Sequence, residues 1–291
     1  MKRILREQAK VYCFDRSLPP KLRVSPGEKF VVETEDASSG YLCKEGQSPL
    51  NRPFIDETWP PSANPVGGPI YIEGARRGDL LAIKIEDILV AADQSYTFSA
   101  RRGPIHDSLK WSQAAEPYTH VLRHEPGIAV APEREVLTSI FGQGIGGGNI
   151  DCRDMRPGNT FFVNSQNDGG LLFVGDVHAS QGDTEFSGVA AETRAEVTLS
   201  VEIIPGKKIS YPRIETPTSL ISLYNSRPLE HAVSRAMFLL MEWMVEEYGF
   251  TRRDAYMQVS VNPGVRVHVY QMIPEMALLY TAGVEFPRDC L

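Results

Sequence analysis

The segment that most constrains the fold is "AEVTLSVEII", residues 195–204, in which apolar and polar side chains alternate. Val197, Leu199 and Val201 fall on one face, while Glu196 and Thr198 fall on the other. Successive side chains of a strand point to opposite sides of the sheet, so a sustained period of two indicates a strand with one buried face. The segment therefore predicts a half-buried β-strand.

The first two hundred residues continue in the same style, with short apolar runs between turns. The chain contains 24 glycines and 21 prolines, and these residues interrupt the apolar runs at short intervals. The runs at 29–37, 68–75 and 78–90 have the composition of strands that end in turns. No internal repeat and no low-complexity linker is visible, and the segment 99–127 has the weak periodicity of a long loop or lid. We therefore predict a β-rich body.

Helical periodicity appears only near the C-terminus. Apolar residues recur at i, i+3 and i+4 from Leu229 to Tyr248, with Pro228 before them and Gly249 after them, which predicts an amphipathic helix. Thr251 and Asp254 have the spacing of a capping box and predict a second, shorter helix. The class is therefore mainly β with a C-terminal helical hairpin, α+β overall. We expect one domain over 1–291, with a possible division into a β-rich body, 1–215, and an α+β portion, 216–291.

Composition excludes several classes of function. The 30 basic and 37 acidic residues give a net charge of −7, which argues against a partner such as nucleic acid or an anionic membrane. No apolar run approaches the ~20 residues of a membrane-spanning helix, and the first residues lack the pattern of a secretory signal. The four cysteines are far apart and form no CxxC pair, which predicts reduced thiols and a cytoplasmic protein; they are Cys13, Cys43, Cys152 and Cys290.

Acidic residues and one histidine gather around a short apolar run, 171–174. Asp176 and His178 are two residues apart, so in extended geometry they point the same way. Gly182 permits a turn, after which Asp183 and Glu185 are again two apart. One hairpin can therefore present an imidazole and three carboxylates to a common point, and residues 149–151 and Glu192 can add further oxygens.

Such a cluster needs compensation if it is buried, because like charges within ~4–6 Å raise one another's pKa and weaken the fold. A divalent cation resolves the conflict by pairing with the carboxylates while neutral histidine completes its shell. One imidazole with several carboxylates favours zinc, and calcium is possible if oxygen ligands dominate. The alternative is that the acids cap turns and face solvent, with His178 as a half-buried hydrogen-bonding residue.

Several long motifs, in order along most of the chain, resemble the acetamidase/formamidase family. The chain is similar to the family's N-terminal signature at 64–88 and to the short acidic turn before it, "TEDA". "GGNID" resembles its GGN-hydrophobic-D block, and "GDVHASQGDTE" resembles its G-D-x-H-x-x-x-G-D-G-E block. "PRIETPTSL" and "DAYMQVSV" resemble later landmarks.

The resemblance implies a β-sandwich or barrel-like, homo-oligomeric enzyme that carries a metal near the acidic hairpin. It would hydrolyse a small primary amide to a carboxylate and ammonia. Matching positions give the candidate set, which is Asp36, Asn149, Asp151, Asp176, His178, Gly182, Asp183, Glu185 and Glu192.

Within this set we predict a metal shell and a catalytic group. The predicted catalytic residues are Glu185 as general acid/base, Asp183 as the next candidate for that role, and Asn149 to orient the amide. The predicted ligands are His178, Asp36, Asp151 and Glu192, with Asp176 beside them.

The sequence departs from the family pattern at three places. Thr184 stands where glycine is usual, the residue before GGN is Gly146 rather than the expected histidine, and residues 261–276 match poorly. These departures bear on the substrate and on one metal ligand. They leave open a family relative with another substrate, or a non-catalytic, metal-stabilised β-sandwich that binds a small ligand.

Other candidate groups lie outside the cluster. Cys152 beside Arg153 is a rival nucleophile, although a small strand residue is the simpler interpretation. The remaining histidines support weaker expectations: a metal pair at His120 and His124, a lid residue at His106, a solvated His231, and a polar surface or subunit contact at His268.

Overall fold

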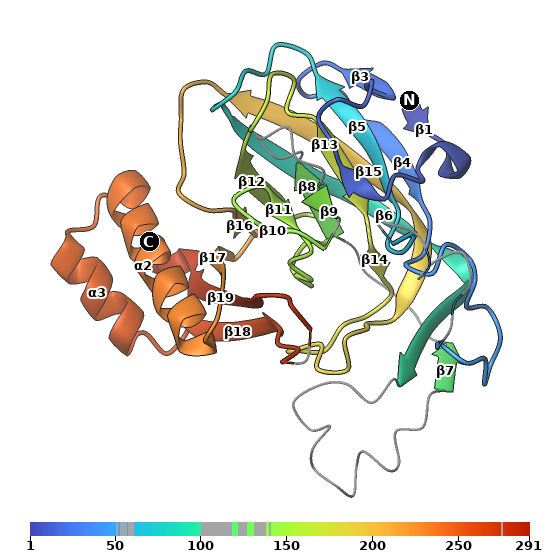
Figure 1. Cartoon of the computed structure of the whole chain (residues 1–291). Helices are drawn as coiled ribbons and strands as arrows, with labels where there is room; N and C mark the ends of the chain where they lie inside the picture. Colours follow the sequence, from blue (N-terminus) through green and yellow to red (C-terminus); the bar gives the residue numbers. More distant parts are fainter. Residues whose placement is uncertain are drawn as a thin grey trace, which may run out of the picture.

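The computed structural model describes residues 1–50, 52, 57, 61–99, 118–121, 127–130, 138–139, 141–274 and 276–291. Within these residues, two large β-sheets form the body, and two helices lie together at one side, next to the C-terminal strands (Figure 1). This arrangement confirms the predicted class, mainly β with a C-terminal helical hairpin. None of the described helices is long and apolar enough to cross a membrane.

The larger sheet has 11 strands in the described residues, nine of them in a continuous path. In spatial order they are β1 (Lys2–Ile4), β4 (Phe30–Thr34), β15 (Glu192–Ile204), β6 (Leu80–Ser99), β12 (Thr160–Asn164), β16 (Arg213–Glu215), β17 (Ser219–Ser226), β19 (Tyr280–Pro287) and β18 (Arg266–Gln271). Two further strands join this path: β14 (Val177–His178) pairs with β15, and β7 (Tyr118–Val121) pairs with β6.

The smaller sheet has six described strands and faces the first. Its order is β10 (Gln143–Gly144), β11 (Gly147–Gly148), β8 (Gly127–Val130), β13 (Leu172–Gly175), β5 (Val66–Ile72) and β3 (Leu22–Val24). A separate pair is formed by β2 (Cys13–Phe14) and β9 (Thr138–Ser139). Two short 3-10 turns, Arg6–Gln8 and Arg288–Cys290, complete the described elements.

The main core lies between the two sheets, which is the geometry of a β-sandwich. Strand β15 contributes Val197, Leu199 and Val201, all fully buried, which are the residues that the alternation places on one face. Ile70 of β5 and Leu172 of β13 pack into the same core from the other sheet. The predicted face of β15 is therefore confirmed, and it is this face that holds the two layers together.

A second core lies between the helices and the C-terminal strands. Helix α2 (Leu229–Tyr248) buries Ala236, Leu240 and Trp243 against β17 and β19. It ends at Gly249, whose φ of 73° is the left-handed conformation that glycine adopts without a steric penalty.

Helix α3 (Arg252–Val261) begins as the spacing predicts. The Thr251 hydroxyl oxygen accepts a hydrogen bond from the Asp254 N–H at 3.1 Å and donates to the Asp254 carboxylate at 2.6 Å. Strands β16 and β17, on the two sides of residue 215, are hydrogen-bonded neighbours in the large sheet. The division of the chain into 1–215 and 216–291 therefore stays a prediction.

Candidate functional site

The cluster begins where β13 passes into β14. Asp176, with a φ of 56°, forms the bend between the two strands, and β14 then pairs with β15 so that His178 lies directly opposite Glu192. Directly opposed residues in an antiparallel pair have Cβ atoms only ~4.5–5.5 Å apart. This register therefore brings the imidazole and the carboxylate together: His178 Nε2 is 3.6 Å from Glu192 Oε1 and 3.7 Å from Asp176 Oδ1.

A bend after the glycine-rich strand β11 supplies the second side of the cluster. Gly148 has a φ of 94°, and a Cβ there would lie 1.9 Å from the Gly142 carbonyl oxygen, so only glycine fits. The bend delivers Asn149 and Asp151, whose side chains are joined by a 3.0 Å hydrogen bond from Nδ2 to Oδ2. This packing explains why "GGN" precedes the acidic residue.

Glu185 enters the cluster from the loop after β14. The Thr184 N–H donates to the Val269 carbonyl, and the Thr184 carbonyl accepts from the Met272 N–H at 2.7 Å, so the loop is attached to β18 and the segment after it. This attachment holds Glu185 in a buried position, with a φ of 40°.

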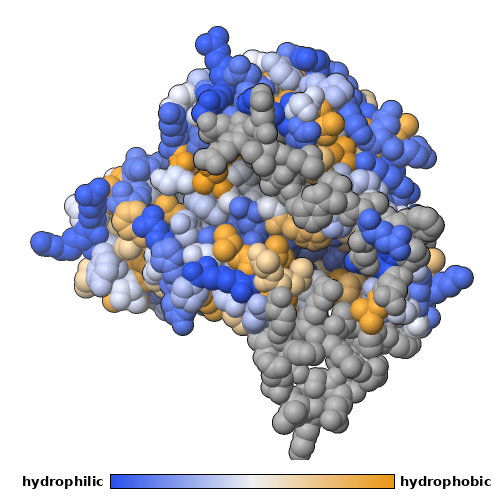
Figure 2. Space-filling model, viewed as in Figure 1, coloured by the Kyte–Doolittle hydropathy of each residue, from blue (hydrophilic) through white to orange (hydrophobic). Residues whose placement is uncertain are grey.

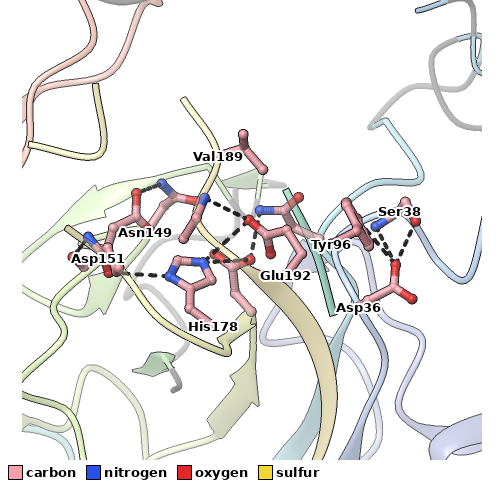
Figure 3. Close-up of polar contacts among 12 residues, drawn as sticks. Asp36, Ser38, Tyr96, Asn149, Asp151, His178, Val189 and Glu192 are labelled. Atoms are coloured by element: carbon pink, nitrogen blue, oxygen red, sulfur yellow. Dashed lines mark hydrogen bonds and ion pairs between the residues drawn. The ribbon is translucent and has the colours of Figure 1, made fainter. Parts of the chain in front are cut away.

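Two groups of three potential ligands result, and they share the histidine. One is Asp151, Asp176 and His178, and the other is His178, Glu185 and Glu192; within each group the ligand atoms lie within 4.8 Å of one another. Figure 3 shows Asp151 and Asn149 on one side of the His178 ring and Glu192 on the other. The structure therefore brings together six residues of the predicted set, namely Asn149, Asp151, Asp176, His178, Glu185 and Glu192.

Burial and mutual repulsion raise the pKa of every carboxyl whose shift is resolved in the cluster. Burial, together with the Asp176 charge, raises the pKa of Asp151 to about 6. Burial also raises the pKa of Glu192 to about 8, and burial with the Asp151 charge raises that of Glu185 well above its ordinary value. Burial lowers the pKa of His178, but the charges of Glu192 and Asp176 outweigh it and raise that pKa well above its ordinary value. The cluster therefore contains more acidic groups than its single imidazole can keep ionised.

The donor set fits a divalent cation. Glu185 Oε2 and Glu192 Oε2 are both buried, and neither has a hydrogen-bond partner among the described residues. Unpaired buried carboxylate oxygens are costly, and a cation offers them a partner. One imidazole nitrogen with several carboxylate oxygens is a combination that zinc accepts. The chemistry of these side chains is therefore that of a possible metal centre.

Two predicted residues lie outside this group. The Asp36 carboxylate is 7% exposed but is occupied by its own turn, since Oδ1 accepts from the Ser38 N–H at 2.8 Å and the Ser38 hydroxyl at 2.6 Å. The Tyr96 hydroxyl also donates to it at 3.3 Å (Figure 3). Asp183 has a side chain that is 45% exposed and lies 2.7 Å from Arg153 Nη1. Neither residue belongs to the two ligand groups.

The rival nucleophile and the other histidines have different surroundings. Cys152 is buried in the main core, and burial with the nearby Asp154 raises the pKa of its thiol well above the ordinary value, which disfavours a reactive thiolate. His268 accepts from Arg153 Nη2 and donates to Glu285 at 2.8 Å, and exposed His231 contacts the Ser226 hydroxyl at 2.7 Å. His120 falls in β7, whereas His106 and His124 lie outside the described residues.

A cavity of about 610 Å³, open mouth included, lies over the cluster. Its lining combines the polar side chains of the cluster with apolar side chains, namely Phe98, Phe141, Val189, Ile273, Met276 and Leu278. Figure 2 shows hydrophobic and hydrophilic residues meeting around a hollow near the centre of this face. The cavity can therefore hold a small molecule that carries both polar and apolar groups.

Two glutamines outside the predicted set also contact the cluster. Gln181 lies 3.3 Å from His178 Nδ1, measured to its Oε1, and Gln271, 1% exposed, donates to Asp151 Oδ2. Gln181 stands inside the "HASQGD" motif, so its position was a usable signal. Gln271 had none, because only the approach of β18 to Asp151 gives it a role.

Comparisons with known proteins agree with this architecture. The model of the Acetamidase/Formamidase family matches residues 2–134 and 134–284. An acetamidase structure from Bacillus halodurans is 27% identical, covers 99% of this chain and 98% of that one, and superposes with a TM-score of 0.85. An acetamidase structure from Yersinia enterocolitica is 28% identical, with coverage of 99% and 92% and a TM-score of 0.83.

A curated relative from Schizosaccharomyces pombe, which carries a provisional formamidase name, is 25% identical over 77% of this chain. The chain spans 58% of the length of that relative. The family match, by contrast, extends over nearly the whole sequence and includes every residue of the buried cluster. The chain therefore belongs to the acetamidase/formamidase family.

Proposed function

We propose that this protein is a metal-dependent amidohydrolase that converts small linear primary amides, of the formamide and acetamide type, to a carboxylate and ammonia. The observation that carries the proposal is the pair of unpartnered, buried carboxylate oxygens of Glu185 and Glu192 beside His178. The matches to acetamidase structures support the class of reaction.

In this proposal the ligands of a divalent metal, with zinc favoured and calcium possible, are His178, which both groups share, Asp151 and Asp176 of one group, and Glu192 of the other. A metal bound there would polarise the amide carbonyl and lower the pKa of a bound water to about 7. Asp36 is left out because its carboxylate already accepts four hydrogen bonds from its own turn and Tyr96.

Glu185 is the proposed proton carrier. Burial and the Asp151 charge raise its pKa well above that of an ordinary glutamate, so the carboxyl holds a proton more readily than an exposed glutamate does. Glu185 accepts a proton from the attacking water as the C–O bond forms. It then donates that proton to the amide nitrogen as the C–N bond breaks, so the products are a carboxylic acid, ionised in water, and ammonia.

The lining of the cavity favours substrates with an apolar acyl group. Asn149, next to Asp151, lines the cavity and is proposed to hydrogen-bond the amide group. Phe141, Val189 and Ile273 also line it, and they would cover a methyl or a longer alkyl chain. We also propose that the protein is cytoplasmic, because its four cysteines are free. We propose a homo-oligomer because of the family to which the chain belongs.

Ammonia release tests the proposal directly. The purified protein is stripped with a chelator and assayed with formamide, acetamide, propionamide and butyramide, before and after zinc or calcium is restored. Glu185→Gln should lower kcat by roughly 10²–10⁴-fold, whereas Glu230→Gln, an exposed glutamate on α2, should leave it unchanged.

Two outcomes would contradict the proposal. Full activity in the stripped protein would exclude a metal-dependent reaction. Zinc binding without turnover of any amide would instead favour a metal-stabilised sandwich that only binds its ligand.

A further inference from the structure

Gln181 connects three parts of the site. It lies three residues after His178, in the turn that follows β14. Its Nε2 donates to the Asp151 carbonyl and to the Tyr270 carbonyl, the latter at 3.0 Å, and its Oε1 is 3.3 Å from His178 Nδ1. The one carboxamide therefore links the histidine strand, the bend after β11 and the end of β18.

The chemistry of these partners decides which way the amide points. A backbone carbonyl can only accept hydrogen bonds, so the two carbonyls of Asp151 and Tyr270 require the NH₂ group of Gln181. The amide oxygen must then face His178 Nδ1, and an oxygen can only accept. His178 must therefore donate from Nδ1, which means that its Nδ1 carries a proton.

We propose that Gln181 is a positioning residue that fixes His178 as the Nδ1–H form, with Nε2 directed at the carboxylates of Asp176 and Glu192. Nε2 lies 3.7 Å and 3.6 Å from these two oxygens, so the ring presents it where the metal of the proposed function is held. The inference rests on that proposed function. A ligating histidine characteristically donates its other ring N–H to a partner that sets the tautomer, and loss of such a partner costs about 10–100-fold in metal affinity or activity.

Two substitutions distinguish this role from a purely structural one, in which Gln181 only stabilises the fold through its hydrogen bonds to the two carbonyls. Gln181→Glu keeps an oxygen for His178 Nδ1–H but loses the N–H groups that serve the two carbonyls. Gln181→Met has a similar length and loses both functions. If Gln181 positions His178, zinc affinity depends on whether position 181 keeps an oxygen that accepts from His178 Nδ1–H. Gln181→Met, which has no such oxygen, should bind zinc about 10–100-fold more weakly. Gln181→Glu, which keeps one, should stay within a few-fold of the parent protein. The stability of the metal-free protein falls in both variants.

Zinc affinity is measured by competition with a chromophoric chelator, and the ring is observed by long-range ¹H–¹⁵N NMR of histidine-labelled protein. The zinc-loaded parent should show a protonated Nδ1 that exchanges slowly with water, and Gln181→Met should lose that protection. Ser180→Ala, in the same turn and exposed, is the control and should match the parent in both measurements.

The outcomes distinguish this inference from the proposed function. A Gln181→Met protein with parental zinc affinity and a parental Nδ1–H signal would overturn the positioning role. A parent protein that binds no zinc would overturn the proposed function, and the Nδ1–H exchange rate would still report on Gln181. If Gln181→Met does not fold, the Gln181→Glu protein carries the test, because loss of its Nδ1–H protection would contradict the role.

Discussion

Thr184 has a backbone φ of 74°, although it is a β-branched residue and such residues rarely adopt a left-handed conformation. The reason is its backbone pairing: the N–H donates to Val269 and the carbonyl accepts from Met272. The family block has glycine at this position, which needs no compensation for a positive φ. The departure noticed in the sequence is therefore a local strain next to Glu185.

Thr184→Gly should relieve this strain. Left-handed strain in a non-glycine residue costs about 1–3 kcal/mol, and glycine loses about 0.5–1 kcal/mol through chain entropy. The free energy of unfolding should therefore rise by up to about 1–2 kcal/mol, as measured by urea denaturation. Thr218→Gly, at an exposed threonine without a positive φ, is the control and should lower it. A loss of stability in Thr184→Gly would show that the threonine side chain makes a compensating contact.

Gln271 shows how one buried amide holds a site residue. Its Nε2 donates to Asp151 Oδ2, while its Oε1 accepts from Gln143 Nε2 at 2.7 Å. Gln271→Met leaves both partners without this bond, so we expect a loss of about 1–3 kcal/mol in the free energy of unfolding and weaker zinc binding. Gln258→Met, a partly exposed glutamine on α3, is a matched control for the same exchange. Equal effects of the two substitutions would contradict a specific role for Gln271.

At the scale of elements, β18 and β19 form a polar link beside the site. Glu285 of β19 accepts from His268 Nε2 of β18 at 2.8 Å and from the Ser219 hydroxyl of β17. The His268 hydrogen bond lowers the pKa of Glu285, outweighing the effect of burial, which raises it. A carboxyl whose folded pKa is lowered stabilises the protein above its unfolded pKa, and that contribution is lost as the pH falls through the folded pKa.

Glu285→Gln should therefore destabilise the protein in a pH-dependent way. Because the side chain is 26% exposed, the loss at pH 7 should be modest, about 0.5–1.5 kcal/mol. The difference from the parent should shrink as the pH falls below about 4.3, the ordinary pKa of a glutamate, towards the lowered pKa of folded Glu285. Urea denaturation at pH 7 and at pH 3.5 measures it, with Glu230→Gln as control. A difference that is constant with pH would assign the effect to packing rather than charge.

At the scale of the whole molecule, the cluster joins the body of the sandwich to its C-terminal part. Asp151 and His178 belong to segments of the body, whereas Gln271 and the carbonyl of Tyr270 come from β18, at the edge of the large sheet. Three buried acids and the half-buried Asp176 repel one another at this junction, so occupation by a cation should stabilise the whole fold.

Zinc should therefore raise the melting temperature of the stripped protein, and a chelator should reverse the change. A ligand present at 100 times its Kd adds about 2.7 kcal/mol. In Glu192→Gln, zinc should raise the melting temperature less. The stripped variant should melt at or above the parental temperature, because the unfavourable burial of an ionisable carboxyl among other acids is gone. A parental zinc response in Glu192→Gln would exclude Glu192 as a ligand.

The sequence by itself determined the elements whose pattern is local. The alternation at Val197 to Val201 and the stripe of α2 predict their buried faces, because strand and helix periods place side chains without reference to the rest of the chain. The D-x-H spacing and the family motifs also predict the cluster around His178.

Only the tertiary structure decided which acids share that cluster. Asp183 and Glu185 are two apart in the sequence, but positive φ values at Thr184 and Glu185 turn the loop so that one side chain faces Arg153 and the other is buried. The Asp36 carboxylate accepts a hydrogen bond from Tyr96 of β6. Gln181 and Gln271 make their contacts only because β18 lies beside the cluster: Gln181 donates to the Tyr270 carbonyl, and Gln271 donates to Asp151. A period-two rule cannot foresee these outcomes, because turn conformations and long-range strand pairing, rather than local spacing, set the direction of each side chain.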